Sequence, residues 1–320
     1  MARADLLVKL VKSGNSGDQP LFKKVVRSII AEERTKQHNI LADQLERILV
    51  EGNKKEKYPK PYLNVKGNPV EQFITQLQPQ VPLSTLYFSK EILSVVNELK
   101  EEHFRADLLR AHNLEPRHKI LLTGEPGTGK TSLAEAIATD LMLPLFIVRY
   151  EGIIGSYLGE TATRLAKMFD YVSTQNCVLF FDEFDAVGKE RGDIHETGEI
   201  KRVVNSLLLQ IDKLPEYVIV IAATNHPELL DRAVWRRFQI KLQIDKPDKP
   251  LIEKYIKDFE KDFDLKLGTQ TATLANKLIG LSFSEITDIF NDIRRKYILT
   301  LPNNNLKKIT KDKIDSATKK

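Results

Sequence analysis

One stretch of the sequence restricts the possible folds more than any other: KILLTGEPGTGKTSLAEAIA, residues 119–138. It has the order G-x-x-x-x-G-K-T, placed after a strand-like apolar run and before a helix-like run. A glycine-rich turn in that position can direct its backbone N–H groups at phosphate oxygens, next to a helix N-terminus that favours negative charge. The pattern predicts a phosphate-binding loop made of Gly124, Gly127, Thr128, Gly129, Lys130, Thr131 and Ser132.

Two residues of this loop have predicted roles beyond shaping it. The Lys130 ammonium would reach the β- and γ-phosphates of a nucleotide, and the Thr131 hydroxyl would ligate Mg²⁺. A glycine-rich turn that matches the pattern by chance is the alternative. The strand before the motif and the helix after it favour the phosphate loop.

The chain around this motif alternates short apolar runs with helix-sized segments, from about Pro82 to Pro247. This alternation predicts an α/β domain, residues 82–247, in which helices cover both faces of a parallel sheet. The runs expected to form strands are KILLT, LPLFIV, CVLFF, YVIVIAA and IKLQI. Residues 248–320 have helical periodicity throughout and predict a C-terminal all-α domain with a basic tail.

The N-terminal part has a different character. Three amphipathic stripes in residues 1–52 predict a small helical domain, which could act as an adaptor or recruit a substrate. Residues 53–81 are rich in proline, lysine and polar residues and are typical of a linker.

Composition excludes several classes of protein. A chain of 320 residues with 42% apolar residues can bury a core, and its apolar runs are shorter than the ~20 residues of a membrane span. The single cysteine, Cys177, allows no internal disulfide and favours the cytoplasm. The net charge of +5 comes from basic ends, but no aromatic residues interleave with them, so nucleic acid is the less favoured partner.

A pair of carboxylates, Asp182 and Glu183, follows the apolar run CVLFF. The carboxyl ends of parallel strands form the ligand-binding edge of a sheet, so we expect both side chains near the phosphate loop. Asp182 can hold the Mg²⁺ shell, and Glu183 can polarise a water for attack on the γ-phosphate. Together the two motifs predict hydrolysis of a nucleotide as well as binding.

These motifs resemble the AAA family within the AAA+ ATPases, over about residues 82–300. GEPGTGKT stands where the family usually has GPPGTGKT, so Glu125 departs from the pattern without altering the phosphate ligands. The resemblance implies a P-loop NTPase core with an α-helical lid, and ATP and Mg²⁺ as cofactors. It also implies that Asn225 contacts the attacking water or the γ-phosphate.

Arg236 and Arg237 stand where the family has its arginine fingers. Such residues project into the nucleotide site of a neighbouring subunit and stabilise charge that develops in the transition state. The resemblance therefore implies a homo-oligomer, typically a ring of six subunits. Without the resemblance, the two arginines would be an ordinary surface pair.

The segment Tyr157-Leu158-Gly159 corresponds to the family's pore loop, which contacts an extended polypeptide. The alternative is that Tyr157 packs into a subunit interface. Residues 188–199 form either a second pore loop or an ordinary solvated loop.

The segment GLSFSE resembles the family's lid motif G-Y-S-G-A-D, which makes Gly280 and Ser282 candidate nucleotide contacts. Phe283 departs from this motif because the family usually has a glycine there, which permits close approach to the base and ribose. Glu285 departs as well, in place of an aspartate.

The leading functional hypothesis is a ring that uses Mg-ATP to remodel, unfold or thread a protein substrate. Compact bacterial AAA proteins of this build resemble those paired with a separate subtilisin-like serine protease. The alternatives are a loader or initiator ATPase that acts on nucleic acid, and a scaffold whose assembly is timed by the nucleotide.

Overall fold

The structure is a computed structural model of the chain. It describes residues 70, 72–153, 158–185, 194–263, 265–301 and 305–317, together with positions 25, 26, 28–31 and 34. Contacts divide the chain into two units, Met1–Pro61 and Tyr62–Lys320. In the first unit the described positions are helical and bury Val25, Val26, Ile29 and Ile30. The rest of the predicted N-terminal helical domain, residues 1–52, lies outside the described residues.

A six-stranded sheet forms the centre of the described part of the second unit, with the order β1-β3-β4-β5-β2-β6. Its strands are β1 (Ile74–Leu77), β2 (Lys119–Thr123), β3 (Leu145–Val148), β4 (Cys177–Phe181), β5 (Val218–Thr224) and β6 (Ile240–Gln243). All neighbours run parallel except β1, which pairs antiparallel with β3. Every residue of β4 and β5 is buried, as expected for central strands covered on both faces. The predicted α/β fold is therefore confirmed.

The edge strand β1 lies within residues 53–81, the range for which the sequence predicts a linker. Its backbone pairs with β3 from Ile74 opposite Val148 to Leu77 opposite Leu145. Only Ile74 of the four residues is buried, because an edge strand needs less apolar surface than a central one. The sheet thus begins before Pro82, and the weak apolar pattern of ITQL gives little sign of it.

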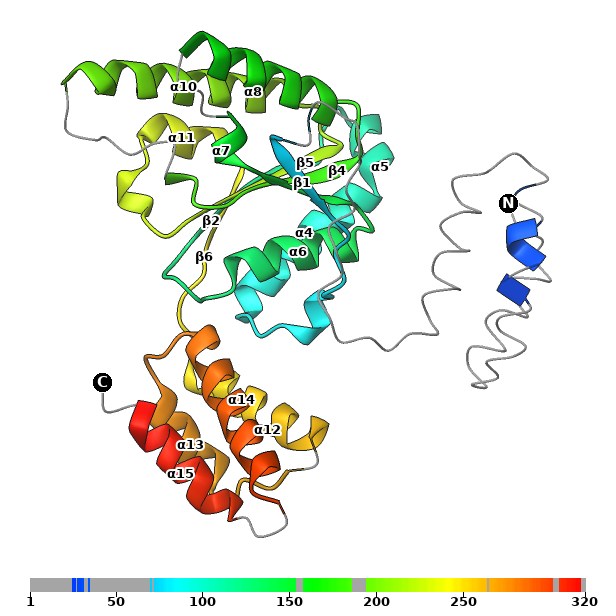
Figure 1. Ribbon diagram of the computed structural model, residues 1–320. Helices are drawn as coiled ribbons and strands as arrows, with labels where there is room; N and C mark the ends of the chain where they lie inside the picture. Colours follow the sequence, from blue (N-terminus) through cyan, green and yellow to red (C-terminus); the bar gives the residue numbers. More distant parts are fainter. Residues whose placement is uncertain are drawn as a thin grey trace. The chain divides into compact units, whose positions relative to one another are not determined.

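Two layers of helices cover the two faces of this sheet (Figure 1). On one face, α4 (Lys90–Phe104) and α6 (Lys130–Asp140) pack on residues such as Val178 and Phe180. On the other, α8 (Leu158–Val172) and α10 (Ile194–Lys213) pack on Leu179 and Phe181. Successive β4 side chains alternate between the two cores. The shorter elements are η1 (Leu83–Thr85), α5 (Ala106–Ala111), α7 (Tyr150–Ile153), η2 (Pro227–Leu229) and α11 (Arg232–Arg237).

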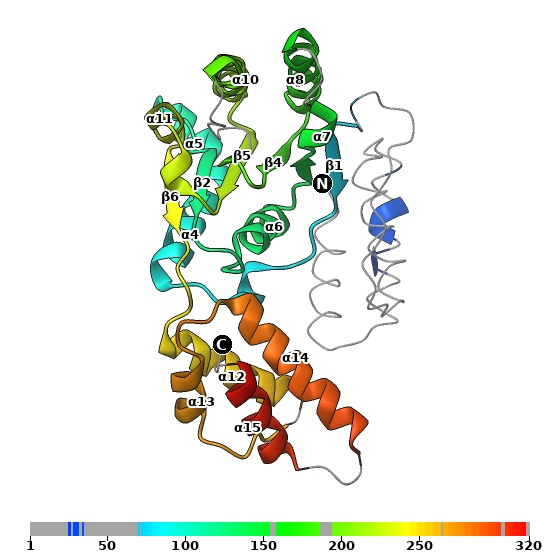
Figure 2. The same cartoon turned by 60° about the vertical axis from the view of Figure 1, so that its left-hand side comes forward.

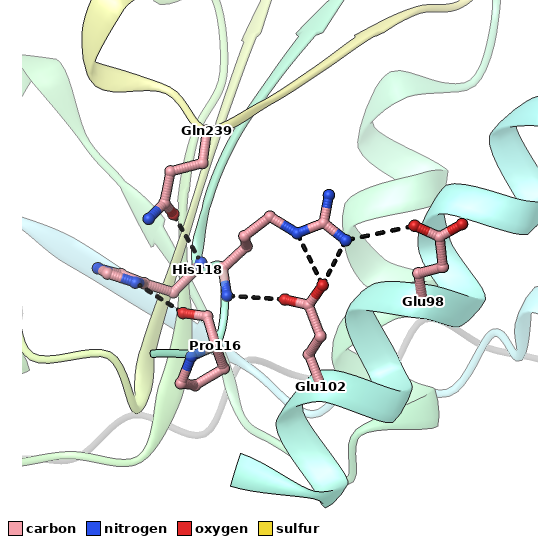
Figure 3. Close-up of polar contacts among 6 residues, drawn as sticks. Glu98, Glu102, Pro116, His118 and Gln239 are labelled. Carbon is pink, nitrogen blue, oxygen red and sulfur yellow. Dashed lines mark hydrogen bonds and ion pairs between the residues drawn. The ribbon is translucent and has the colours of Figure 1, made fainter. Parts of the chain in front are cut away.

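A polar cluster joins α4 to the start of β2, at the end of the strand remote from the phosphate loop (Figure 3). The Arg117 backbone N–H donates to Glu102 at 2.9 Å, and the Arg117 Nε donates to the same carboxylate at 2.7 Å. The next residue, His118, donates its backbone N–H to the Gln239 side chain at 2.9 Å. These bonds fix where β2 enters the sheet and therefore where its other end delivers the phosphate loop.

Four C-terminal helices form a bundle with a core of its own, seen clearly in Figure 2. They are α12 (Lys249–Asp262), α13 (Thr271–Leu278), α14 (Phe283–Leu299) and α15 (Leu306–Ala317). Asp248 caps α12, and Ser282 with Glu285 forms a capping box at the start of α14. No helix among the described residues is long and apolar enough to cross a membrane.

Candidate nucleotide site

The loop between β2 and α6 wraps around the N-terminus of α6. Gly129 caps the helix with a φ of +101°, a conformation that residues with a side chain rarely adopt. Gly124 lies so close to the chain after β6 that an added Cβ would be 2.2 Å from the Ile244 carbonyl oxygen. The two glycines are therefore needed for the turn and for the close approach. The first N–H groups of a helix have no partner within it, so those of α6 can bind a phosphate.

Lys130 lies in the middle of this loop and is buried, with 7% of its surface exposed. Its ammonium donates to the carbonyls of Gly124 and Glu125, each at 2.8 Å. Burial lowers the pKa of Lys130, while the charges of Asp182 and Asp185 oppose that shift. An ammonium carries three N–H donors, so a phosphate oxygen can be bound by the remaining one.

The loop meets the end of β4 through Thr131 and Asp182. The Thr131 hydroxyl donates to the Asp182 carboxylate at 3.0 Å. The described residues contain no cluster of three or more His, Cys, Asp or Glu side chains that could hold a metal ion. A hydroxyl next to one carboxylate fits Mg²⁺, which is typically held by one or two protein oxygens together with substrate phosphates.

Glu183 has an unusual backbone, with a φ of +46°. Its N–H donates to the Asp182 carboxylate at 3.0 Å, and the following N–H of Phe184 donates to the Ala223 carbonyl at 2.8 Å. A non-glycine residue in this conformation is strained, and such residues cluster at functional sites. The structure brings Glu183 together with Asn225, the residue after β5, at the edge of one cavity.

The cavity has a volume of about 560 Å³, within the usual range for small-molecule sites. We call the part lined by the phosphate loop with Asp182 and Glu183 the phosphate end, and the part lined by Tyr87, Tyr255 and Phe283 the aromatic end. The lining residues are Thr85, Leu86, Tyr87, Phe88, Pro126, Gly127, Thr128, Gly129, Lys130, Thr131, Ser132, Asp182, Glu183, Asn225, Tyr255, Phe283, Ser284, Thr287 and Asp288.

The aromatic end comes from three separate segments of the chain. Tyr87 stacks on Phe283, with ring centroids 5.7 Å apart, and Tyr255 meets both rings edge-on. The Tyr87 hydroxyl donates to Asp258 of α12 at 3.0 Å, and burial together with this bond raises the pKa of Tyr87. No sequence pattern singles out Tyr87 or Tyr255. Of the three aromatic residues, only Phe283 stands out in the sequence, as a departure from the family pattern.

The two predicted lid residues lie in different surroundings. Ser282 is buried, caps α14 and would be 2.8 Å from a Cβ added at Gly127, so it lies against the phosphate loop. The backbone N–H of Ser284 donates to the Gly127 carbonyl at 3.1 Å, which joins the same helix end to the loop. Gly280 has a φ of +91°, and neither Gly280 nor Ser282 is among the described residues that line the cavity.

The predicted arginine fingers lie in the last turn of α11. Arg236 is exposed, whereas Arg237 is partly buried and donates to Asp212 at 2.7 Å and to the Ala233 carbonyl at 3.2 Å. Neither arginine is among the described residues that line the cavity of its own chain.

The predicted pore loop lies largely outside the described residues. Tyr157 is one of the residues not described. Leu158 and Gly159 are the first two residues of the helix α8. In the possible second loop, residues 188–193 also lie outside the described residues, and Ile194 begins α10.

Comparison with known proteins identifies the family. Residues 120–246 match the family model described as "ATPase family associated with various cellular activities (AAA)". An uncharacterized AAA family ATPase, y4kL, of Sinorhizobium fredii is 39% identical over 289 residues, which cover 89% of this chain and 86% of that protein.

Other relatives match a smaller part. A putative 26S proteasome regulatory subunit homolog of Methanothermobacter thermautotrophicus is 38% identical over 46% of this chain and 41% of its own length. A cell division cycle protein 48 homolog of Archaeoglobus fulgidus is 35% identical over 56% of this chain and 25% of its own length. This chain therefore spans less than half of each of these two proteins. The phosphate loop, the paired carboxylates and a relative similar along most of both chains lead to one conclusion: this chain belongs to the AAA family of ATPases.

Proposed function

We propose that the chain hydrolyses Mg-ATP as a ring oligomer, typically of six subunits, and uses the energy to remodel, unfold or thread a protein partner. The observation that carries the proposal is the cavity in which Lys130, the Thr131–Asp182 pair, Glu183 and Asn225 converge. These groups can bind a triphosphate, hold its cation and direct a water at its terminal phosphate.

Each residue has one part in this mechanism. Lys130 and the N–H groups of the loop hold the phosphates, and Thr131 with Asp182 would ligate Mg²⁺. When bound, Mg²⁺ neutralises phosphate charge. The Glu183 carboxylate orients the attacking water and accepts its proton, while the Asn225 amide can hydrogen-bond the water or the γ-phosphate. The aromatic end holds the adenine.

The arginines support the ring. Arg236 and Arg237 are not among the described residues that line the cavity of their own chain, so a role in hydrolysis would place them at the site of a neighbouring subunit. This arrangement makes each site depend on two chains. A protein partner is supported by the names of the relatives: one is a proteasome regulatory subunit homolog, and another, from Methylacidiphilum infernorum, is an ATP-dependent zinc metalloprotease.

The partner would be gripped by Tyr157, Leu158 and Gly159, which precede or open α8. A separate subtilisin-like protease would supply any cleavage. The single cysteine, Cys177, is buried in β4, which fits a structural role in a cytoplasmic protein.

The first experiment measures the solution mass of Glu183→Gln by light scattering, with and without Mg-ATP. The amide should leave ATP bound but not hydrolysed, which stabilises an ATP-dependent ring. A chain that binds ATP but stays monomeric at every concentration would contradict the ring.

A mixing experiment tests the arginines directly. Glu183→Gln has an inactive site with intact arginines, and Arg237→Ala has an intact site with a defective arginine. Each variant alone should be nearly inactive, whereas mixed rings should regain part of the ATPase activity. Two inactive variants that form mixed rings without regaining activity would contradict action on a neighbour.

A further inference from the structure

A buried carboxylate, Asp185, lies beside the site and has no part in the mechanism above. Only 7% of its surface is exposed, and it is not among the described residues that line the cavity. Carboxylates are seldom buried unless they are paired or hydrogen-bonded, so its surroundings need an explanation. Its partner is the hydroxyl of Thr224, a fully buried residue at the end of β5, which donates to Asp185 at 2.7 Å.

The Thr224 hydroxyl makes a second bond. Its oxygen accepts the backbone N–H of His226 at 2.9 Å while its proton points to Asp185. This bond closes a tight turn around the residue between them, Asn225, which lines the cavity. The orientation of Asn225 is therefore tied to Thr224, and through Thr224 to Asp185.

The chain before Asp185 is held in the same way. Strands β4 and β5 are neighbours, with Phe181 opposite Ala222, so the segments that follow them leave the sheet side by side. The Phe184 N–H donates to the Ala223 carbonyl at 2.8 Å. One backbone bond and one side-chain bond thus join the two segments, immediately after the strained Glu183.

A strained residue keeps its conformation only when its surroundings hold it. Glu183, with its φ of +46°, is preceded by the end of β4 and followed by these two bonds. Phe184 adds an anchor, because its ring is buried edge-on against Phe181 and Phe238.

We propose that Asp185 and Thr224 are positioning residues for hydrolysis: their hydrogen bond fixes the positions of Glu183 and Asn225 relative to each other at the cavity. This inference rests on the roles of Glu183 and Asn225 in the proposed function. Neither Asp185 nor Thr224 is among the cavity-lining residues of the described chain, so they act through their neighbours.

The test uses two substitutions at one position. Thr224→Val removes the hydroxyl with almost no change of shape, and Thr224→Ser keeps it. We expect Thr224→Val to lower kcat roughly 10- to 100-fold, the effect of misplacing reacting groups by about 1 Å. The Kd for fluorescent mant-ADP, which needs neither Glu183 nor Asn225, should change less than about twofold. Thr224→Ser should have a kcat within about threefold of that of the unchanged protein.

A double-mutant cycle then tests whether the two residues act as a pair. Asp185→Asn keeps an acceptor but removes the charge, so it should lower kcat less than Thr224→Val does. The double variant should be no slower than Thr224→Val alone, because one interaction cannot be lost twice. As a matched control, Asp140→Asn alters a carboxylate bound by Lys100 at 2.6 Å outside the site, and its kcat should stay unchanged.

The failures can be told apart by including Glu183→Gln. If Glu183→Gln still hydrolyses ATP, the proposed function itself fails. If Glu183→Gln is inactive while Thr224→Val has the kcat of the unchanged protein, the positioning role is wrong and the proposed function stands. If Thr224→Val loses mant-ADP binding along with kcat, and Thr224→Ser restores neither, the pair has a purely structural role. That result would overturn the inference.

Discussion

The two ends of the nucleotide cavity are built in different ways. The phosphate end is one continuous segment, residues 126–132, joined to the end of a single strand by the bond from Thr131 to Asp182. The aromatic end is assembled from Tyr87, Tyr255 and Phe283, which belong to three distant segments.

This difference reflects the ligand chemistry. Phosphate oxygens need several N–H donors and a cation in a fixed arrangement, and a short backbone loop provides them locally. A planar base needs only apolar and aromatic surface, which many residues can supply from many places. Substitutions at the two ends should therefore affect phosphate binding and base binding separately.

Lys130→Ala should have the largest effect. It removes the buried ammonium of the phosphate end, and charged hydrogen bonds of this kind are worth about 1.5–3 kcal/mol each. We expect the affinity for both ATP and inorganic tripolyphosphate to fall at least ~10- to 100-fold, measured by calorimetry. Lys100→Met is the control, since its ammonium binds Asp140 outside the cavity. Unchanged tripolyphosphate binding by Lys130→Ala would show that the phosphates bind elsewhere.

Phe283→Gly should affect the aromatic end alone. It removes a ring that lines the cavity and stacks on Tyr87. Stacking of a base on an aromatic side chain is worth about 1–3 kcal/mol, so ATP affinity should fall roughly 5- to 100-fold while tripolyphosphate affinity stays the same. Phe263→Leu, at the end of α12 and outside the cavity lining of the described chain, should change neither. Equal losses for ATP and tripolyphosphate would remove the distinction between the ends.

Tyr87→Phe keeps the ring and removes only the hydroxyl that donates to Asp258. This bond joins the segment before α4 to α12, so we expect a lower Tm and a two- to threefold weaker ATP affinity, about 0.5 kcal/mol. Tyr217→Phe is a matched control, because its hydroxyl donates to the Ser173 carbonyl at 2.5 Å, away from the cavity. The control should lower Tm without weakening ATP binding. If both variants bind ATP equally well, the Tyr87 hydroxyl has no part in the aromatic end.

The smallest effect concerns pH and the helix end that touches the phosphate loop. The Ser282 backbone N–H and then its hydroxyl lower the pKa of Glu285, which accepts from them at 2.7 and 2.9 Å. A lowered pKa means that this contribution is fully present above the ordinary value of 4.5 and is lost as pH falls through the lowered pKa. Glu285→Gln should therefore have a lower Tm than the unchanged protein at pH 7, and the gap should close in acid. If the difference in Tm persisted at every pH, it would come from packing and not from the charge of Glu285.

Much of the fold could be predicted from the sequence because its signals are local. The buried runs CVLFF and YVIVIAA are long enough to be central strands, and both lie in the sheet as β4 and β5. The edge strand β1 was missed because ITQL has only one residue that becomes buried. Its strand conformation depends on pairing with β3, a contact between residues far apart in the sequence.

The candidate site divides along the same line. The sequence by itself determined the phosphate loop and the Asp182–Glu183 pair, because a tight turn, a helix N-terminus and a strand end all follow from neighbouring residues. The roles of Arg236, Arg237 and Tyr157 remain predictions. Only the tertiary structure decided that Tyr87, Tyr255 and Phe283 meet, and that Asp185 bonds Thr224. Aromatic residues are common in any core, and a single Asp or Thr in the sequence gives no sign of its partner, so the meaning of these contacts comes from the packing of distant segments.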